Sequence, residues 1–139
     1  MHKDIYSQLK EWEKSLNLVL IEGSGEKAFC AGGDLQFAAS LSKESFFEWY
    51  TIGSHVFHLI STFKIPYVAL WDGIVMGSGV GLSVHAPYQV ATSKTLFAMP
   101  ETGIGMITDA GCSYIFPQLK GELGTFLALT GHRLKGSDW

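Results

Sequence analysis

Two short apolar runs, each followed by a glycine-bearing segment, constrain the fold of this chain more than any other feature. Residues 16–21 (LNLVLI) end at the turn signal Glu22-Gly23-Ser24-Gly25, and residues 67–71 (YVALW) lie between Pro66 and Gly73. Runs of this length bounded by turn residues are typical of buried strands. Helical patterns lie between them, and strands that alternate with helices favour an α/β layered fold with parallel strand pairing.

Helical spacing of apolar residues is clearest in two segments. Ile5, Leu9 and Trp12 predict an amphipathic helix over residues 2–15, and Ser42 is a candidate cap for a long helix that ends near residue 63. The buried stripe of that helix is expected to comprise Phe46, Trp49, Val56, Ile60 and Phe63. Shorter strands are expected at 88–91 and 95–98, a short helix up to His85, and further helices at 112–119 and 122–129, the last ended by Gly131.

Length and composition narrow the classes of function. The 139 residues fit one domain, residues 1–139, and 47% hydrophobic content fits a globular core. A net charge of -3 offers no general attraction to nucleic acid or to an anionic membrane, and no apolar run approaches the roughly 18 residues of a membrane span. We therefore expect neither as a partner. The last residues, Ser137-Asp138-Trp139, are typical of the first turn of another helix, so we expect a truncated fragment.

The two glycine-bearing segments are candidate sites for binding an anion or an oxyanion. Residues 28–34 (AFCAGGD) and 73–81 (GIVMGSGVG) each lie near the start of an expected helix, where backbone N–H groups can point at negative charge. For either segment taken alone, tight turns with close packing are the favoured explanation of the glycines. The spacing at 77–81 is GxGxG rather than the dinucleotide-binding GxGxxG, and neither a P-loop nor a GxSxG serine elbow is present.

Glu101 and Asp109 are the only charged residues between Thr95 and Leu119. Glu101 follows a proline at an expected strand end, and a loop containing Gly103 and Gly105 separates it from Asp109. One interpretation makes Asp109 a helix N-cap and leaves Glu101 exposed. The other brings the two carboxylates face to face, which would split their titrations into an acid and a base. Charge and spacing alone leave both interpretations open.

The other polar side chains carry weaker signals. His55 and His58 lie three residues apart on the long helix, but no carboxylate accompanies them at a metal-ligand spacing, so packing or solvent contact is expected. Cys30 and Cys112 lack the spacing of a zinc site, and we expect no metal. Lys27 precedes the first glycine segment, where it can either meet a substrate phosphate or remain solvated.

Four motifs, in this order, resemble the crotonase (enoyl-CoA hydratase/isomerase) superfamily, and within it the 3-hydroxyisobutyryl-CoA hydrolases. They are 27–35 (KAFCAGGDL), 73–85 (GIVMGSGVGLSVH), 97–111 (FAMPETGIGMITDAG) and 127–136 (LALTGHRLKG). The resemblance implies a crotonase (ClpP-like) spiral of ββα units, here without the first strands and the C-terminal helices of the family. It further implies assembly as a homo-oligomer and a place in the mitochondrial matrix, with the cytoplasm or the peroxisome as alternatives.

The resemblance also assigns roles to individual residues. A coenzyme A thioester would lie with its carbonyl in an oxyanion hole made by the backbone N–H groups of Gly33 and Ser78. Contacts to the substrate would come from Lys27, Ala31, Gly32, Asp34 and Gly77. Glu101 matches the catalytic glutamate and Asp109 the aspartate of the hydrolases. Glu101 could act as a general base or attack the thioester to form an anhydride, and the sequence leaves both routes open. No cofactor is implied beyond the coenzyme A of the substrate.

Departures from the family pattern bear on the choice of reaction. Hydratases carry a second glutamate at the position of Gly81, so hydrolysis fits the present residues better. Ser78 replaces a usual glycine, Thr108 replaces a common proline, and residues 52–55 stand where relatives have a Glu-Tyr pair. The expected function is hydrolysis of 3-hydroxyisobutyryl-CoA in valine breakdown. The alternatives are an enoyl-CoA isomerase that uses Glu101 alone and a non-catalytic subunit of a larger assembly such as a mitochondrial ribosome.

Overall fold

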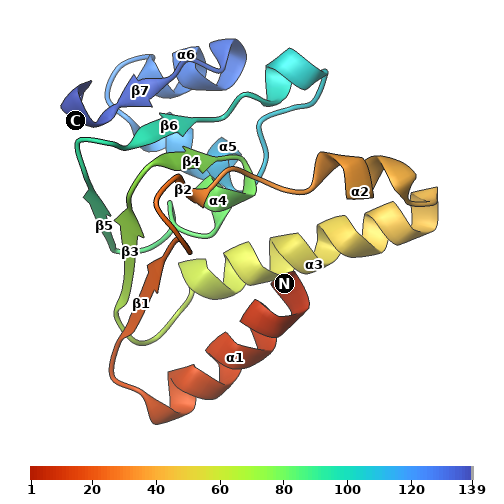
Figure 1. The fold of residues 1–139 in the computed structure, drawn as a ribbon, viewed down its shortest axis with the longest axis vertical. Coiled ribbons are helices and arrows are strands. Elements are labelled where there is room, and N and C mark those ends of the chain that lie inside the picture. Colours follow the sequence, from red (N-terminus) through yellow and green to blue (C-terminus); the bar gives the residue numbers. More distant parts are fainter. Residues whose placement is uncertain (139) are drawn as a thin grey trace.

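The computed structural model describes residues 1–138, which form two small sheets with helices packed around them (Figure 1). The first half contains α1 (His2–Ser15), β1 (Val19–Glu22), β2 (Ala28–Cys30), α2 (Leu35–Ser40), α3 (Lys43–Ser61), β3 (Tyr67–Trp71) and β4 (Ile74–Met76). The second half contains α4 (Ser78–Gly81), β5 (Tyr88–Ala91), β6 (Leu96–Ala98), η1 (Glu101–Ile104), α5 (Cys112–Ile115), η2 (Phe116–Gln118), α6 (Leu123–Thr130), β7 (Leu134–Lys135) and η3 (Gly136–Asp138).

The first six strands, β1 to β6, alternate between the two sheets, and β7 joins the second sheet beside β6. One sheet has the order β1-β3-β5 and is parallel throughout, while the other has the order β2-β4-β6-β7, with only β7 antiparallel. Each β-β pair therefore adds one strand to each sheet before a helix or loop leads to the next pair. This repeat is the spiral of ββα units that the motifs imply, and it places the ends of β2, β4 and β6 side by side.

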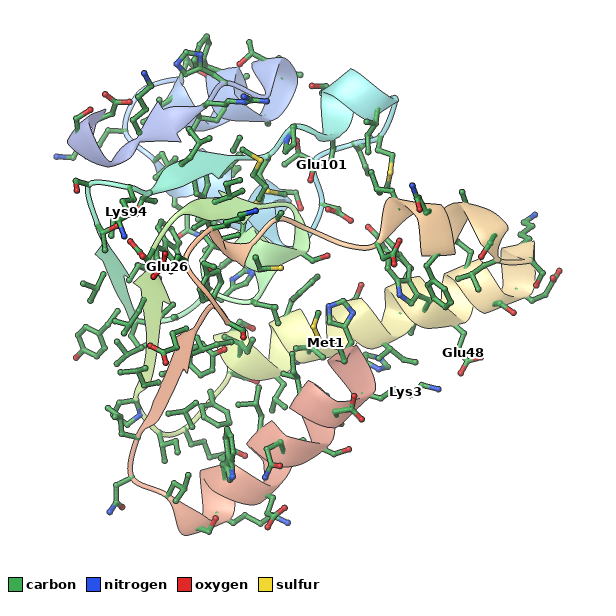
Figure 2. The ribbon with its side chains drawn as sticks, viewed as in Figure 1. Met1, Lys3, Glu26, Glu48, Lys94 and Glu101 are labelled. Atoms are coloured by element: carbon green, nitrogen blue, oxygen red, sulfur yellow. The ribbon has the colours of Figure 1, made fainter. Side chains whose placement is uncertain are left out.

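The two long helices pack against each other on one side of the sheets (Figure 1). α3 begins where the sequence predicts, because the Ser42 side chain accepts a hydrogen bond from the Ser45 amide at 3.2 Å. Val56 and Ile60 of the expected stripe are buried, and the other three members are partly buried. Figure 2 shows the exposed Lys3 of α1 beside Glu48 of α3, and their side chains form a 3.3 Å ion pair.

The core lies between the sheets and α3. Alternate residues of β3 are buried, which matches the period-two pattern of a strand. The buried Tyr67 hydroxyl donates to the Leu82 carbonyl at 3.1 Å and so ties β3 to the turn after α4. Within residues 1–138, no helix is long and apolar enough to cross a membrane.

Several elements differ from the expectation. α2 was not expected, although Asp34 caps it by accepting from the Phe37 amide at 2.9 Å. β4 and β7 have only three and two residues, too few for a periodic pattern. The expected helix at 112–119 changes to a 3-10 turn at Phe116, next to Pro117, which has no backbone N–H to donate. Ser137 and Asp138 form a 3-10 turn, while Trp139 lies outside the described residues.

Candidate active site

Both glycine segments and both candidate carboxylates meet at one cavity beside α3. Gly33, Ser78, Glu101 and Asp109 all line it, together with Gly77. These residues come from the loop after β2, the start of α4, the turn after β6 and the loop before α5. The parallel register explains their meeting, because β2, β4 and β6 are neighbours and their carboxyl ends lie at one edge of the sheet.

The glycines allow the loops to approach closely. Gly77 has φ +52, and a Cβ there would lie 3.4 Å from the Gly32 Cα and 3.3 Å from Oε1 of Glu101. At Gly33 a Cβ would lie 3.2 Å from the Trp49 ring and 3.6 Å from the Ser78 hydroxyl oxygen. The structure therefore brings Gly33 and Ser78 together, and their role as an oxyanion hole stays a prediction.

Glu101 lines the cavity and is buried. It begins η1 where β6 ends, as Figure 2 shows, and only 7% of it is exposed. Its Oε2 atom has no hydrogen-bond partner among the described residues. Burial raises the pKa of Glu101 and the charge of Asp109 raises it further, while a backbone hydrogen bond at Glu101 opposes the shift. The interpretation that leaves Glu101 exposed is wrong, and the side chain has an oxygen available for a substrate or a water.

Asp109 lies half-buried in the loop between η1 and α5. That loop begins where the Met106 amide donates to the Glu101 carbonyl at 3.0 Å, and it is held at Thr108, whose hydroxyl donates to the Ala128 carbonyl at 3.0 Å. The expected alternative of a capping role is wrong: the N-cap of α5 is Gly111, without a side-chain cap. Asp109 instead faces the cavity, where its charge acts on Glu101.

Tyr50 is a site residue that sequence analysis missed. It projects from α3 into the same cavity, and burial raises its pKa to about 12, helped by a hydrogen bond with Asp109 and by the charges of Asp109 and Glu101. The family pattern indicates residues 52–55 as the segment that contacts substrate, and Gly53 and Ser54 of this segment also line the cavity. The tyrosine therefore lies just before that segment, on the helix face that points at Asp109.

Apart from Gly77, the residues that are predicted to contact the substrate do not line the cavity. Gly32 and Asp34 line a groove that adjoins the cavity, and the Asp34 carboxylate is engaged in capping α2. Ala31 is exposed in the loop between β2 and the cavity. Lys27 is exposed at the opposite end of β2 and lines neither the cavity nor the groove. A role for Lys27 in binding phosphate stays a prediction.

Two histidines and two cysteines are the polar residues for which the sequence predicts no special role. His55 and His58 are exposed on α3, and neither cysteine forms a disulfide. Among residues 1–138, no group of three histidine, cysteine or acidic side chains is arranged to hold a metal ion.

A model of the enoyl-CoA hydratase/isomerase family matches residues 1–139. The chain belongs to this family. A crystal structure of an enoyl-CoA hydratase from Rhodobacter sphaeroides superimposes with a TM-score of 0.91 at 31% identity, covering 99% of this chain and 43% of that one. A carnitinyl-CoA dehydratase structure from Mycobacterium thermoresistibile gives a TM-score of 0.86 at 37% identity, again over 99% of this chain and 43% of that one. The crotonase fold implied by the motifs is confirmed.

Curated relatives are more similar in sequence than these structures. The mitochondrial 3-hydroxyisobutyryl-CoA hydrolase of Danio rerio is 54% identical and that of Rattus norvegicus 51%, each over 99% of this chain and 37% of the relative. The small ribosomal subunit protein mS47 of Neurospora crassa is 47% identical over 98% of this chain and 28% of its own length. The chain thus spans little more than a third of the hydrolases that it matches.

Proposed function

We propose that the protein hydrolyses an acyl-CoA thioester at the cavity that Glu101 and Asp109 share. The observation that carries the proposal is the buried Glu101 carboxylate, whose Oε2 has no hydrogen-bond partner among the described residues, beside Asp109 and across from the two glycine loops. A buried carboxylate oxygen without a hydrogen-bond partner is costly for the fold, so its retention is explained by a reaction that uses it.

The geometry supports the two requirements of thioester hydrolysis. The backbone N–H groups of Gly33 and Ser78 are the proposed donors to the carbonyl oxygen, whose negative charge grows in the tetrahedral intermediate. In one route, ionised Glu101 takes a proton from a water whose oxygen attacks the carbonyl carbon. Collapse of the intermediate then breaks the C–S bond, and the departing thiolate takes a proton from the Glu101–Asp109 pair. In the other route, a Glu101 oxygen attacks the carbonyl carbon, and the C–S bond breaks to give an anhydride and the CoA thiolate. Water then cleaves the anhydride to the free acid and Glu101, and the proton released in this step goes to the thiolate.

Gly81 supplies a physical reason to prefer hydrolysis to hydration. A Cβ at this position would lie 2.7 Å from the Phe57 ring and 2.8 Å from the Ala110 Cβ. The space that a second glutamate would need is therefore filled by Phe57 and Ala110. This packing also disfavours an isomerase with an additional acid at position 81, but it leaves open an isomerase that uses Glu101 alone.

The substrate we propose is 3-hydroxyisobutyryl-CoA, with a role in valine breakdown inside mitochondria and no cofactor beyond the CoA of the substrate. The similarity to hydrolases of that name supports this choice, and their names include the word mitochondrial. The second candidate is a non-catalytic subunit of a mitochondrial ribosome, which the 47% identity to mS47 favours. The paired Glu101 and Asp109 favour the enzyme. Under the proposal of an enzyme, the protein is a homo-oligomer with neither nucleic acid nor a membrane as a partner.

The test is incubation of the intact protein with a panel of CoA thioesters and a thiol reagent. A hydrolase releases free CoA thiol, fastest from the substrate with a branched hydroxyacyl group, whereas an isomerase changes the acyl chain and releases none. Absence of thiol release from every thioester, together with co-purification of ribosomal RNA, would favour the ribosomal alternative.

A further inference from the structure

Asp109 depends on an unusual backbone conformation directly after it. Ala110 has φ +52 and is the one residue other than glycine with a positive φ among the described residues, and Gly111 follows with φ +80. Side chains with a Cβ rarely adopt this conformation, so something must hold Ala110 in it. The Asp109 carbonyl then accepts from the Cys112 amide at 2.9 Å, which turns the chain into α5.

His85 occupies the place where that support is needed. It lies four residues after α4 ends, and its ring fills the space beside Gly111: a Cβ there would be 2.6 Å from the ring Cε1 and closer still to Nε2. Its ring also makes a hydrogen bond with the Ala110 backbone. Burial lowers the pKa of His85 and outweighs that bond, which raises it; the neutral form of the ring has one N–H to donate.

A second contact joins the same two segments. Gly81, at the end of α4, packs so closely on Ala110 that a Cβ there would lie 2.8 Å from the Ala110 Cβ. The stretch from Ser78 to His85 therefore begins at a proposed oxyanion donor and ends on the loop that carries Asp109. This contact therefore fixes the position of the proposed oxyanion donor relative to the loop that carries Asp109.

We propose that His85 is a positioning residue: its ring N–H bonds to the Ala110 carbonyl and fixes the left-handed turn that aims Asp109 at Glu101. His85 lines a second groove, which shares Tyr50, Asp109 and Ala110 with the cavity, but it does not line the cavity itself, so we place its action at Asp109 rather than on the substrate. The role in turnover rests on the proposed hydrolysis, whereas the role in holding the loop does not.

Two substitutions separate the hydrogen bond from the packing. His85→Phe keeps a ring on Gly111 but removes the donor, while His85→Gln keeps an N–H donor and removes the ring. In the intact protein we expect His85→Phe to lower kcat by about 10- to 100-fold with little change in KM. His85→Gln should retain most of kcat. His58→Ala, an exposed histidine that lines the same groove, is the matched control and should behave as wild type.

A double-mutant cycle shows whether His85 acts through Asp109. If it does, His85→Phe should have little further effect on kcat in an Asp109→Asn background. An equal loss in both backgrounds, or full activity of His85→Phe alone, would overturn the proposal.

Amide hydrogen exchange gives a readout that does not need activity. We expect the Cys112 amide to exchange faster in His85→Phe than in wild type, and at the wild-type rate in His85→Gln. Unchanged exchange in His85→Phe would contradict the positioning role even if the protein hydrolyses no thioester. Faster exchange in His85→Phe, combined with no thiol release by the wild-type protein, would instead support the role of His85 in holding the loop and contradict the proposed hydrolysis.

Discussion

The Glu101 carboxylate lies directly against Gly77, so that a Cβ on this glycine would stand 3.3 Å from Oε1. The same Cβ would stand 3.4 Å from the Gly32 Cα. Gly77 is thus the point where the loop after β4, the loop after β2 and the glutamate meet. Its lack of a side chain lets the backbone of both loops reach a thioester placed beside Glu101.

Gly77→Ala tests this meeting point. The new methyl group would require an L residue at φ +52 and would press on Glu101, so we expect kcat/KM to fall by about 10- to 100-fold and the protein to lose some stability. Gly103→Ala is the matched control, because a Cβ there has nothing within 4 Å and no left-handed backbone is required. Steady-state thiol release checks both variants, and equal activities would contradict the close contact.

Tyr50→Phe tests the residue that sequence analysis missed. The substitution removes the phenolic hydroxyl and with it the hydrogen bond to Asp109, so we expect kcat to fall by about 10-fold. Exchange of Phe46, which stacks on Tyr50 at 6.2 Å between ring centroids, for leucine keeps the hydroxyl and should cost much less. The ratio of the two kcat values measures the contribution of the hydrogen bond. A Tyr50→Phe enzyme with wild-type kcat would assign the hydroxyl no role.

Glu101→Gln should change how stability depends on pH. Because burial raises the folded-state pKa of Glu101 above its ordinary 4.5, its contribution to stability is fully present below 4.5 and is lost as the pH rises through the raised value. The glutamine variant, which does not ionise, should therefore gain in melting temperature relative to wild type between pH 4 and pH 7. Glu11→Gln, on the exposed face of α1, is the control. A constant difference across this range would contradict the raised pKa.

Gly81→Glu asks whether the missing glutamate of the hydratases can be restored. The side chain would overlap Phe57 and Ala110, so we expect a less stable protein, with a lower melting temperature by several degrees, and no hydration of an enoyl-CoA. The double variant Gly81→Glu, Phe57→Ala relieves only one of the two overlaps. Hydration by a stable Gly81→Glu protein would show that the space exists.

The sequence allows the longer elements and the site motifs to be predicted, because their signals are local. β1 and β3 are apolar runs bounded by turn residues, and Ser42 gives the start of α3. The order of four motifs places Glu101 and Asp109 together, although their charge and spacing alone do not. Short elements such as β4 lack a period that sequence analysis can detect.

Contacts between distant segments account for most of what could not be predicted. Tyr50 reaches Asp109 only because α3 packs beside the loop before α5, and His85 meets Gly111 only because the turn after α4 lies against it. The N-cap interpretation of Asp109 is wrong for the same reason: the local pattern is compatible with a cap and with a pair of carboxylates, and contacts with distant segments determine where the carboxylate faces. The role proposed for Lys27 is still a prediction.

The most direct test of the account compares Glu101→Gln and Asp109→Asn with wild type in the intact protein. Thiol release from 3-hydroxyisobutyryl-CoA would be measured beside the dissociation constant for free CoA. The account predicts that each substitution lowers kcat by about 10²- to 10⁴-fold while CoA binding stays within a few-fold of wild type. Wild-type turnover in both variants would contradict the central claim that this pair of carboxylates performs the reaction.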